Sequence, residues 1–408
     1  MTTRSGILST QDVEKLLQPT LNAEGSRVEG ISVRSLTKPG DNYGSTMLAV
    51  DVSLSPGPRT LHFVAKMLPK SAVIQELFQC EVTVRKEVNT YLLVSPAYER
   101  IQKENNVPED KYIDVFPKCY AARTSSKGSA APVDDSAIIL QENLKVQGFE
   151  CGNRFTGLDL AHCKIVVDKL ARFHATAIAM KLEKPEEFKA TVLQTTTKVT
   201  IGPPDRMLIR LFENVPEYES LKERIETSIL KSKKIFDGVY PSSPREPFAT
   251  LIHLDLWTNN IMFQYRPGSS KINPTSLKFV DFQVTGYGSP ARDLIFFLYT
   301  SASLEVLSEN FDKLVRLYHE NFLDCLRILG CDATPFSFDE FLKEIEYSSL
   351  VEFWHIGFML NPINVPEKDA INIDTATLDD VVAKSKLAET YFPRASKFLS
   401  DFASKNWI

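Results

Sequence analysis

Residues 253–263 read His-Leu-Asp-Leu-Trp-Thr-Asn-Asn-Ile-Met-Phe, and residues 277–283 read Leu-Lys-Phe-Val-Asp-Phe-Gln. The first segment contains the pattern H-x-D-x-x-x-x-N, and the second is an apolar strand followed by Asp-Phe. Asp255 and Asn260 stand at the two ends of one short loop. The apolar parts of the two segments can pair as a hairpin, which would bring Asp281 back beside Asn260. The sequence therefore predicts one site that contains two carboxylates and one amide.

These three side chains supply groups that phosphoryl transfer requires. A carboxylate must orient the acceptor hydroxyl and take its proton, and oxygen ligands must hold Mg²⁺ against the phosphates. Asp255, Asn260 and Asp281 together can supply these parts. H-x-D-x-x-x-x-N alone arises by chance in about a few per cent of chains of this length. A phosphoryl-transfer site is therefore indicated only together with further motifs in the right order along the chain.

The region before this site is expected to be mainly sheet. Residues 45–54 and 60–68 are rich in β-formers and flank a Ser-Pro-Gly-Pro turn, so they predict a hairpin. Apolar residues at helical spacing predict a helix over 72–93 that ends before Pro96. Two further short strands are expected at 116–123 and 137–140.

The region from residue 141 onward is expected to be mainly helical. Apolar stripes predict helices over 160–178, 217–236, 308–329 and from 337 toward Pro362. No internal repeat is visible, so we expect one bilobal α+β unit. Its parts are a small antiparallel sheet lobe with one helix (1–140), a hinge near 141–144 and a larger helical lobe (141–408).

The composition excludes several classes of partner. The 408 residues include 47 Lys+Arg against 52 Asp+Glu without a basic block, so neither nucleic acid nor an anionic membrane surface is expected to bind. No apolar run approaches the ~18 residues of a membrane span, and no signal peptide is expected. Six scattered cysteines without a C-x-x-C pair are typical of reduced thiols. We expect a cytoplasmic protein, and nothing in the sequence predicts its oligomeric state.

A series of motifs resembles the ecdysteroid kinase-like family, which is related to choline kinases and aminoglycoside phosphotransferases in the protein-kinase-like superfamily. The motifs are Pro39-Gly-Asp-Asn-Tyr-Gly-Ser45, Phe63-Val-Ala-Lys66, Glu87-x-x-x-Tyr91, Ile138-Ile-Leu-Gln-Glu-Asn-Leu-Lys145, Leu170-Ala-Arg-Phe-His-Ala175, the segment from His253 to Met262, Val280-Asp-Phe-Gln283 and Ala291-Arg-Asp-Leu294. The resemblance covers roughly residues 30 to 300. It implies a kinase-like fold that transfers the γ-phosphoryl group of ATP, with Mg²⁺, to a hydroxyl of an ecdysteroid or another small hydroxylated compound.

The same resemblance implies that Asp255 is the catalytic base and that Asn260 and Asp281 are the metal ligands. It also implies roles for residues in the sheet lobe. Lys66 would hold the α- and β-phosphates and Glu87 would pair with it. The adenine would bind at the hinge, where Gln141 and Asn143 are the candidate contacts. The phosphate loop lacks G-x-G-x-x-G, so backbone N–H groups and Ser45 are expected to cradle phosphate.

Several of these residues have simpler alternative explanations. Glu81 competes with Glu87, but Arg85 is well placed to pair with Glu81 on the helix surface. His174 and His253 are expected to be structural. Asp293 either begins a helix as an acidic first-turn residue or, by the family pattern, braces the catalytic loop.

Three alternative functions remain open at this point. A protein kinase is disfavoured, because only about ten residues separate Asp281 from Arg292 and no A-P-E motif follows. A choline or ethanolamine kinase, or a catalytically silent nucleotide-binding protein, would share the fold. For a steroid-like acceptor, we expect the helix over 337–360 to form a wall of the cleft opposite Asp255, with Phe353, Trp354 and Phe358 as its contributors.

Overall fold

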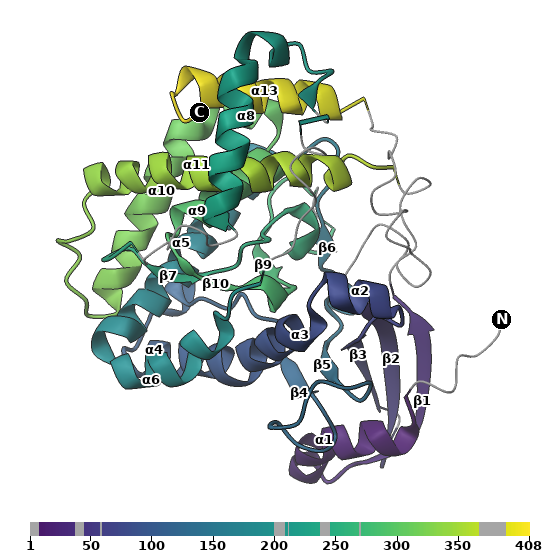
Figure 1. Cartoon of the computed structure of the whole chain (residues 1–408). Helices are drawn as coiled ribbons and strands as arrows, with labels where there is room; N and C mark the ends of the chain where they lie inside the picture. Colours follow the sequence, from purple (N-terminus) through teal and green to yellow (C-terminus); the bar gives the residue numbers. More distant parts are fainter. Residues whose placement is uncertain are drawn as a thin grey trace.

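The structure, a computed structural model, describes most of the chain in two lobes (Figure 1). The described residues are 8–36, 45–57, 59–199, 209–210, 212–236, 245–268, 271–366 and 389–408. Most of the predicted phosphate loop, 39–44, lies outside them. The predicted α+β bilobal fold, with an antiparallel sheet in one lobe and helices in the other, is confirmed.

The sheet lobe contains five antiparallel strands in the order β1-β2-β3-β5-β4. They are β1 (Arg27–Ser35), β2 (Thr46–Ser55), β3 (Arg59–Met67), β4 (Cys119–Arg123) and β5 (Ile138–Glu142). The predicted hairpin is confirmed as β2 and β3, whose register runs from Thr46↔Met67 to Leu54↔Arg59. Strand β1 was not predicted.

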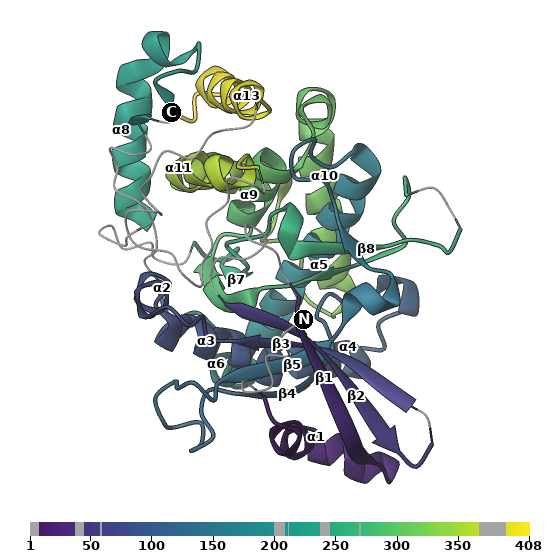
Figure 2. The ribbon, with the colours of Figure 1, turned by 90° about the vertical axis from the view of Figure 1, so that its right-hand side faces the viewer.

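One face of the sheet is covered by a helix that the sequence analysis did not predict, α1 (Thr10–Glu24), as Figure 2 shows. It begins at a capping box formed by Ser9 and Asp12. Its leucines pack against alternate residues of β2 and β3, such as Val50 and Phe63. Because side chains alternate across a strand, Lys66 points to the opposite face. The sheet lobe therefore has more than the single helix expected.

The helix predicted over 72–93 forms consecutive pieces and does not end before Pro96. The pieces are α2 (Ala72–Leu77), α3 (Cys80–Asn89), a π-helical turn (Thr90–Val94) and α4 (Ser95–Glu104). Gln79, with φ of 48°, separates the first two pieces. Pro96 falls in the first turn of α4, where a missing N–H is tolerated, so the chain continues as helix.

Two buried helices organise the second lobe: α10, α6 and α9 contact α5, whose residues from Leu170 to Met180 are all buried, and α8, α9 and α13 contact α11. The helices are α5 (Leu160–Glu183), α6 (Pro185–Thr191), α8 (Tyr218–Phe236), α9 (Ala291–Ser301), α10 (Leu304–Ile328), α11 (Phe338–Ile363) and α13 (Tyr391–Ser404). The four predicted helices are thus confirmed, and Asp159 and Ser337 cap two of them. No described helix is long and apolar enough to cross a membrane.

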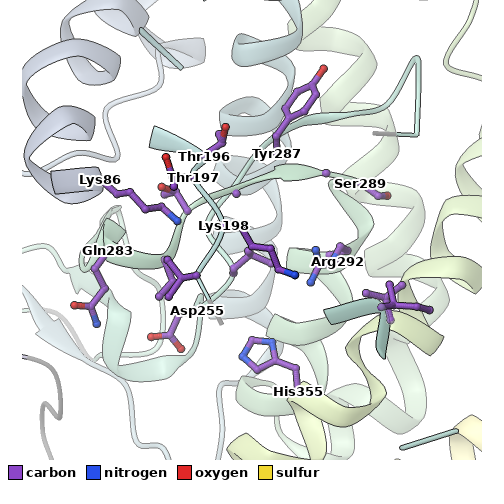
Figure 3. A pocket seen from close by; sticks show the side chains of 18 of the residues that line it. Lys86, Thr196, Thr197, Lys198, Asp255, Gln283, Tyr287, Ser289, Arg292 and His355 are labelled. Carbon is purple, nitrogen blue, oxygen red and sulfur yellow. The ribbon is translucent and has the colours of Figure 1, made fainter. Parts of the chain in front are cut away.

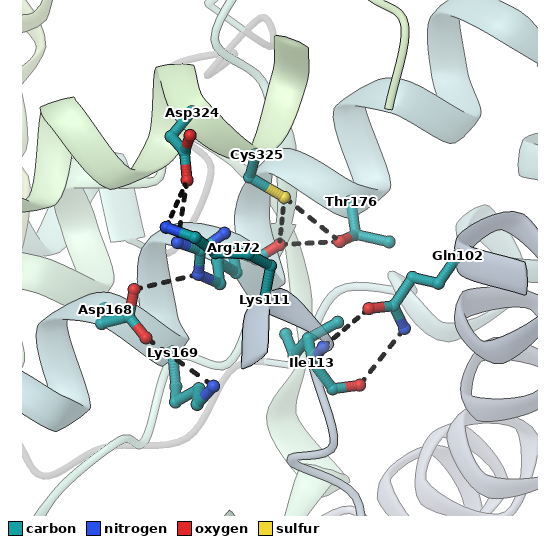
Figure 4. A network of polar contacts seen from close by, with 9 residues as sticks. All are labelled: Gln102, Lys111, Ile113, Asp168, Lys169, Arg172, Thr176, Asp324 and Cys325. Atoms are coloured by element: carbon teal, nitrogen blue, oxygen red, sulfur yellow. Dashed lines mark hydrogen bonds and ion pairs between the residues drawn. The ribbon is translucent and has the colours of Figure 1, made fainter. Parts of the chain in front are cut away.

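Polar contacts fix the segment after α4 to the helical lobe (Figure 4). The Arg172 guanidinium donates to Asp168 at 2.9 Å and to Asp324 at 3.0 Å, and Lys111 donates to Asp324 at 3.2 Å. The Tyr98 hydroxyl of α4 donates to the carbonyl of Phe173 at 2.9 Å. Helix α4 therefore packs with the helical lobe, and a domain boundary at 140/141 stays a prediction.

Candidate active site

The loop that carries Asp255 lies between short strands that bring its two ends together. They are β7 (Thr250–Ile252), β8 (Ile261–Gln264) and β9 (Ser276–Phe279). Ile261 is opposite Phe279, and the N–H of Val280 donates to the carbonyl of Asn260 at 3.0 Å. Asp281 follows immediately, with φ of 68°. The hairpin predicted to return Asp281 to Asn260 is confirmed.

Asn260 also contacts Asp255 directly. Its side-chain amide donates to the backbone carbonyl of Asp255 at 2.8 Å and to the carboxylate at 2.9 Å. Burial raises the pKa of Asp255 well above its usual range and the charge of Asp281 adds to the rise, while the bond from Asn260 opposes it. Asn260 therefore fixes the Asp255 carboxylate, and burial makes this carboxylate bind a proton more readily than an exposed one.

Asp293 braces the start of the loop from α9. Its carboxylate accepts the backbone N–H of His253 at 2.6 Å and that of Leu254 at 2.8 Å. His174 contacts the same carboxylate at 3.0 Å and the Tyr318 hydroxyl at 2.6 Å. The bracing alternative for Asp293 is correct, and His174 is a satisfied core histidine as expected. His253 is also structural, since its Nε2 lies 3.1 Å from the carbonyl oxygen of Val280.

Lys66 joins the two lobes through a buried charge cluster. Its ammonium lies 2.6 Å from the Glu87 carboxylate and 2.7 Å from that of Asp281. Burial disfavours the charged form of Lys66, but the two carboxylates outweigh it and hold its pKa above the ordinary value. Glu81 instead pairs with Arg85 at 2.8 Å, so the choice of Glu87 over Glu81 agrees with the geometry.

The structure also describes the residues predicted to contact adenine and phosphate. Val64 is the β-sheet partner of Gln141, and both share the Lys66 face of the sheet. The side-chain oxygen of Gln141 is buried, and no partner for it lies among the described residues, which fits an amino group of adenine. Asn143 uses its side-chain oxygen to cap a following turn, at 3.2 Å from the N–H of Lys145. Ser45 is buried at the start of β2.

The donor set at the end of the hairpin fits a magnesium ion. The side-chain amide of Asn260 donates both of its hydrogens to Asp255. The side-chain oxygen of Asn260 is therefore left as an acceptor beside the carboxylate of Asp281. Both are hard oxygen ligands of the kind that Mg²⁺ prefers. No group of three or more His, Cys, Asp or Glu side chains among the described residues could hold a metal alone. Phosphate and water oxygens would complete the coordination of such an ion.

A pocket opens beside Asp255 between the two lobes (Figure 3). It has a volume of about 290 Å³. Helix α11 forms one wall, as predicted, through Tyr347, Val351, His355, Phe358 and Met359. Phe358 is therefore correctly assigned to the pocket.

Two other aromatic residues of α11 do not line the pocket. Phe353 is fully buried and stacks on Phe398 with ring centroids 5.1 Å apart. Trp354 is 1% exposed and lies in the core. The prediction for these two residues is wrong for different reasons. Phe353 lies on another side of the helix from the wall residues at 351, 355 and 358. Trp354 lies on the same side as Phe358 and stacks on its ring with centroids 5.8 Å apart, but it is buried and does not line the pocket.

The pocket contains polar residues that the sequence analysis missed. His355 lies 2.7 Å from the carboxylate of Glu352, which also accepts from Arg292. Lys86, from α3, reaches the same pocket. A lysine beside Glu87 and a histidine on an aromatic helix give no signal in one sequence that separates them from surface or core residues.

The brace at Asp293 predicts a specific response to acid. Burial raises its pKa, but the hydrogen bond and charge of His174 and the charge of His253 outweigh burial and lower it. A carboxylate with a lowered folded-state pKa adds stability above the unfolded pKa of about 4, and this stability disappears as pH falls through the folded value. Urea titrations below pH 5 should give a shallower decline in unfolding free energy for Asp293→Asn than for wild type. If the unfolding free energy declined equally in the variant and in wild type, the bracing role of Asp293 would be contradicted.

The chain is similar to several proteins of known structure and to one protein family. A choline kinase structure from Cryptosporidium parvum is similar, with 12% identity, 93% of this chain and 91% of that chain covered, and a TM-score of 0.42. A spectinomycin phosphotransferase in complex with ADP and spectinomycin has 13% identity, 85% and 98% coverage, and a TM-score of 0.37. No curated protein sequence matches significantly. The sequence profile of the ecdysteroid kinase-like family matches residues 39–331, and the chain therefore belongs to that family.

Proposed function

We propose that the protein is an ATP-dependent small-molecule kinase that transfers the γ-phosphoryl group to a hydroxyl of an ecdysteroid or another small hydroxylated compound. The observation that carries the proposal is the position of Asp255. It lines the pocket on one side and is held by Asn260 on the other. An acceptor hydroxyl in the pocket would lie between the base and the phosphate site.

In this mechanism each residue has one task. Lys66 leaves its contact with Asp281 to bind the α- and β-phosphates of ATP, and Glu87 keeps its ammonium in place. Asp255 orients the acceptor hydroxyl and takes its proton as the oxygen attacks the γ-phosphorus and ADP leaves. Mg²⁺, held by Asn260 and Asp281, would neutralise charge on the phosphates. The raised pKa of Asp255 favours its acceptance of the proton.

The alternative functions fit the pocket less well. A protein kinase needs a long segment to hold a polypeptide, but here β10 (Gly286–Gly288) pairs directly with β7, and α9 begins at Ala291. A choline or ethanolamine kinase must bind a cation, yet Lys86 places a buried ammonium in the pocket. A catalytically silent protein would have no need to keep the carboxylates of Asp255 and Asp281 together.

Removal of the base should stop turnover without loss of ATP binding. Asp255→Asn keeps the size of the side chain but removes the group that takes the proton, while the phosphate and metal residues remain. We expect kcat to fall by about 10²- to 10⁴-fold, with Mg·ATP affinity within threefold of wild type. Turnover within tenfold of wild type on any accepted substrate would contradict the assignment.

Removal of the metal carboxylate should have a different signature. Asp281→Ala deletes a ligand of the ion and also one partner of Lys66, so both Mg·ATP affinity and activity should fall together. Calorimetric titration with Mg·ATP measures the affinity, and an ADP-release assay measures the activity. Unchanged affinity for Mg·ATP would show that the metal site lies elsewhere.

The acceptor wall can be tested with two aromatic residues of α11. Phe358→Ala removes a half-buried pocket residue, so the acceptor KM should rise with little change in the KM for ATP. Phe353→Ala removes a core residue on another side of the helix and should destabilise the fold by about 3 to 5 kcal/mol, with unaltered acceptor KM in the folded protein. Thermal unfolding and steady-state kinetics on both variants measure these effects. If Phe358→Ala instead destabilised the fold and left the acceptor KM unchanged, Phe358 would be a core residue and the wall of the pocket would lie elsewhere.

A further inference from the structure

One buried cation in the pocket has no task in the mechanism above. Lys86 is 2% exposed and lines the pocket. Among the described residues, no carboxylate or hydrogen-bond acceptor contacts its ammonium. Figure 3 shows the side chain pointing into the pocket between Gln283 and Thr197. A buried ammonium without a partner is unfavourable, because burial removes its hydration.

The direction of this side chain separates it from the phosphate site. Lys86 and Glu87 are consecutive on α3, and consecutive side chains on an α-helix point about 100° apart. Glu87 is directed to Lys66. Lys86 is therefore turned away from the cluster that would hold the phosphates, toward the acceptor side of Asp255.

The charges around the pocket favour an anion. Its described charged lining residues are Lys86, Lys198, Arg245, Arg292 and Asp255, and its titratable ones also include Tyr287, Tyr347 and His355. Arg245 and Arg292 are already bonded to Glu344 and Glu352. Lys198 is exposed on the segment before residue 200. Lys86 is thus the buried lining cation that lacks a negative partner in the described part of the chain.

We propose that the acceptor carries an acidic oxygen group, a carboxylate, sulfate or phosphate, in addition to the hydroxyl that is phosphorylated, and that Lys86 binds this group. The inference rests on the proposed function for the identity of the pocket as the acceptor site. Among small hydroxylated compounds, the pocket should therefore bind acids and acidic conjugates more tightly than the corresponding neutral compounds or cations.

The ionisation of Lys86 adds a pH dependence to the inference. Burial lowers the pKa of Lys86 to about 7. Its ammonium form, which attracts an anion, is populated below that value and disappears as pH rises through it. Affinity for an acidic ligand should therefore be highest below pH 7 and should fall above it.

A binding experiment without nucleotide tests the inference. Phenyl glucuronide and phenyl glucoside have similar size and hydroxyl groups, but the first carries a carboxylate. By calorimetry at pH 6, we expect wild type to bind the glucuronide about tenfold more tightly than the glucoside. Lys86→Met should abolish this preference and Lys86→Arg should retain it. Arg85→Met is the matched control on the same helix, since Arg85 bonds to Glu81 and to a carbonyl outside the pocket.

A second measurement follows the ionisation of Lys86 itself in the wild-type protein. After mild ¹³C methylation of lysines, the Lys86 resonance, assigned by its absence in Lys86→Arg, should titrate near neutral pH. Inorganic sulfate should raise the midpoint, because an anion favours the charged form. A midpoint that inorganic sulfate leaves unchanged would overturn the inference, because Lys86 would then bind no anion.

The remaining outcomes are also decisive. If wild type shows no preference for the glucuronide, or binds neither compound, or if Lys86→Met keeps the preference, the inference is wrong. An equal loss of kcat by Lys86→Met on neutral and acidic acceptors would assign Lys86 to the phosphoryl group and also overturn it. Because binding is measured without ATP, a protein that preferred the glucuronide but transferred no phosphate would fail the proposed function alone.

Discussion

The ammonium of Lys66, buried between the carboxylates of Glu87 and Asp281, is the contact on which the site depends. The two distances, 2.6 and 2.7 Å, join β3, α3 and the segment after β9, which come from both lobes. Each charge is tolerable only because the others are present, since a buried ion without a partner is destabilising by about 3 to 5 kcal/mol. The cluster therefore fixes the sheet lobe, α3 and the hairpin of β8 and β9 relative to one another. ATP and a metal ion would bind where these charges meet.

A second constraint holds the loop that carries Asp255. The carboxylate of Asp293 accepts two successive backbone N–H groups, of His253 and Leu254, and fixes the turn in which Leu254 has a φ of 63°. A positive φ is unfavourable for leucine, so the conformation needs such support. Asn260 then ties the far end of the loop back to Asp255. Asp255 is in this way held between Asn260 and the pocket.

The parts of the fold that follow local patterns could be predicted from the sequence. The hairpin of β2 and β3, the helices α5, α8, α10 and α11, and the return of Asp281 to Asn260 depend on alternation, periodicity and turn residues, all of which are local. The end expected at Pro96 was wrong, because a π-helical turn places this proline in the first turn of a new helix. The roles of Lys66, Asp255, Asn260 and Asp281 remain predictions, although the structure brings these side chains together.

The acceptor side of the site could be predicted only in outline. The choice of α11 as a wall was correct, but Phe353 and Trp354 lie in the core, while His355 and Phe358 line the pocket. Hydrophobicity does not give the rotation of a helix that is apolar on several sides. Lys86 could not be recognised, since its importance depends on its burial in the pocket and on the charges around it, which only the packing of the two lobes determines.

The central claim, that the Lys66 cluster organises a nucleotide site, is tested most directly by calorimetric titration of Mg·ATP into wild type and Lys66→Met, with circular dichroism to confirm folding. Lys103→Met, at an exposed lysine that pairs with Glu99, is the control. The account predicts saturable binding to wild type and the control, and at least about tenfold weaker binding to Lys66→Met, because the charge that holds the phosphates is lost. Equal affinity of a folded Lys66→Met variant, or no binding by wild type, would contradict it.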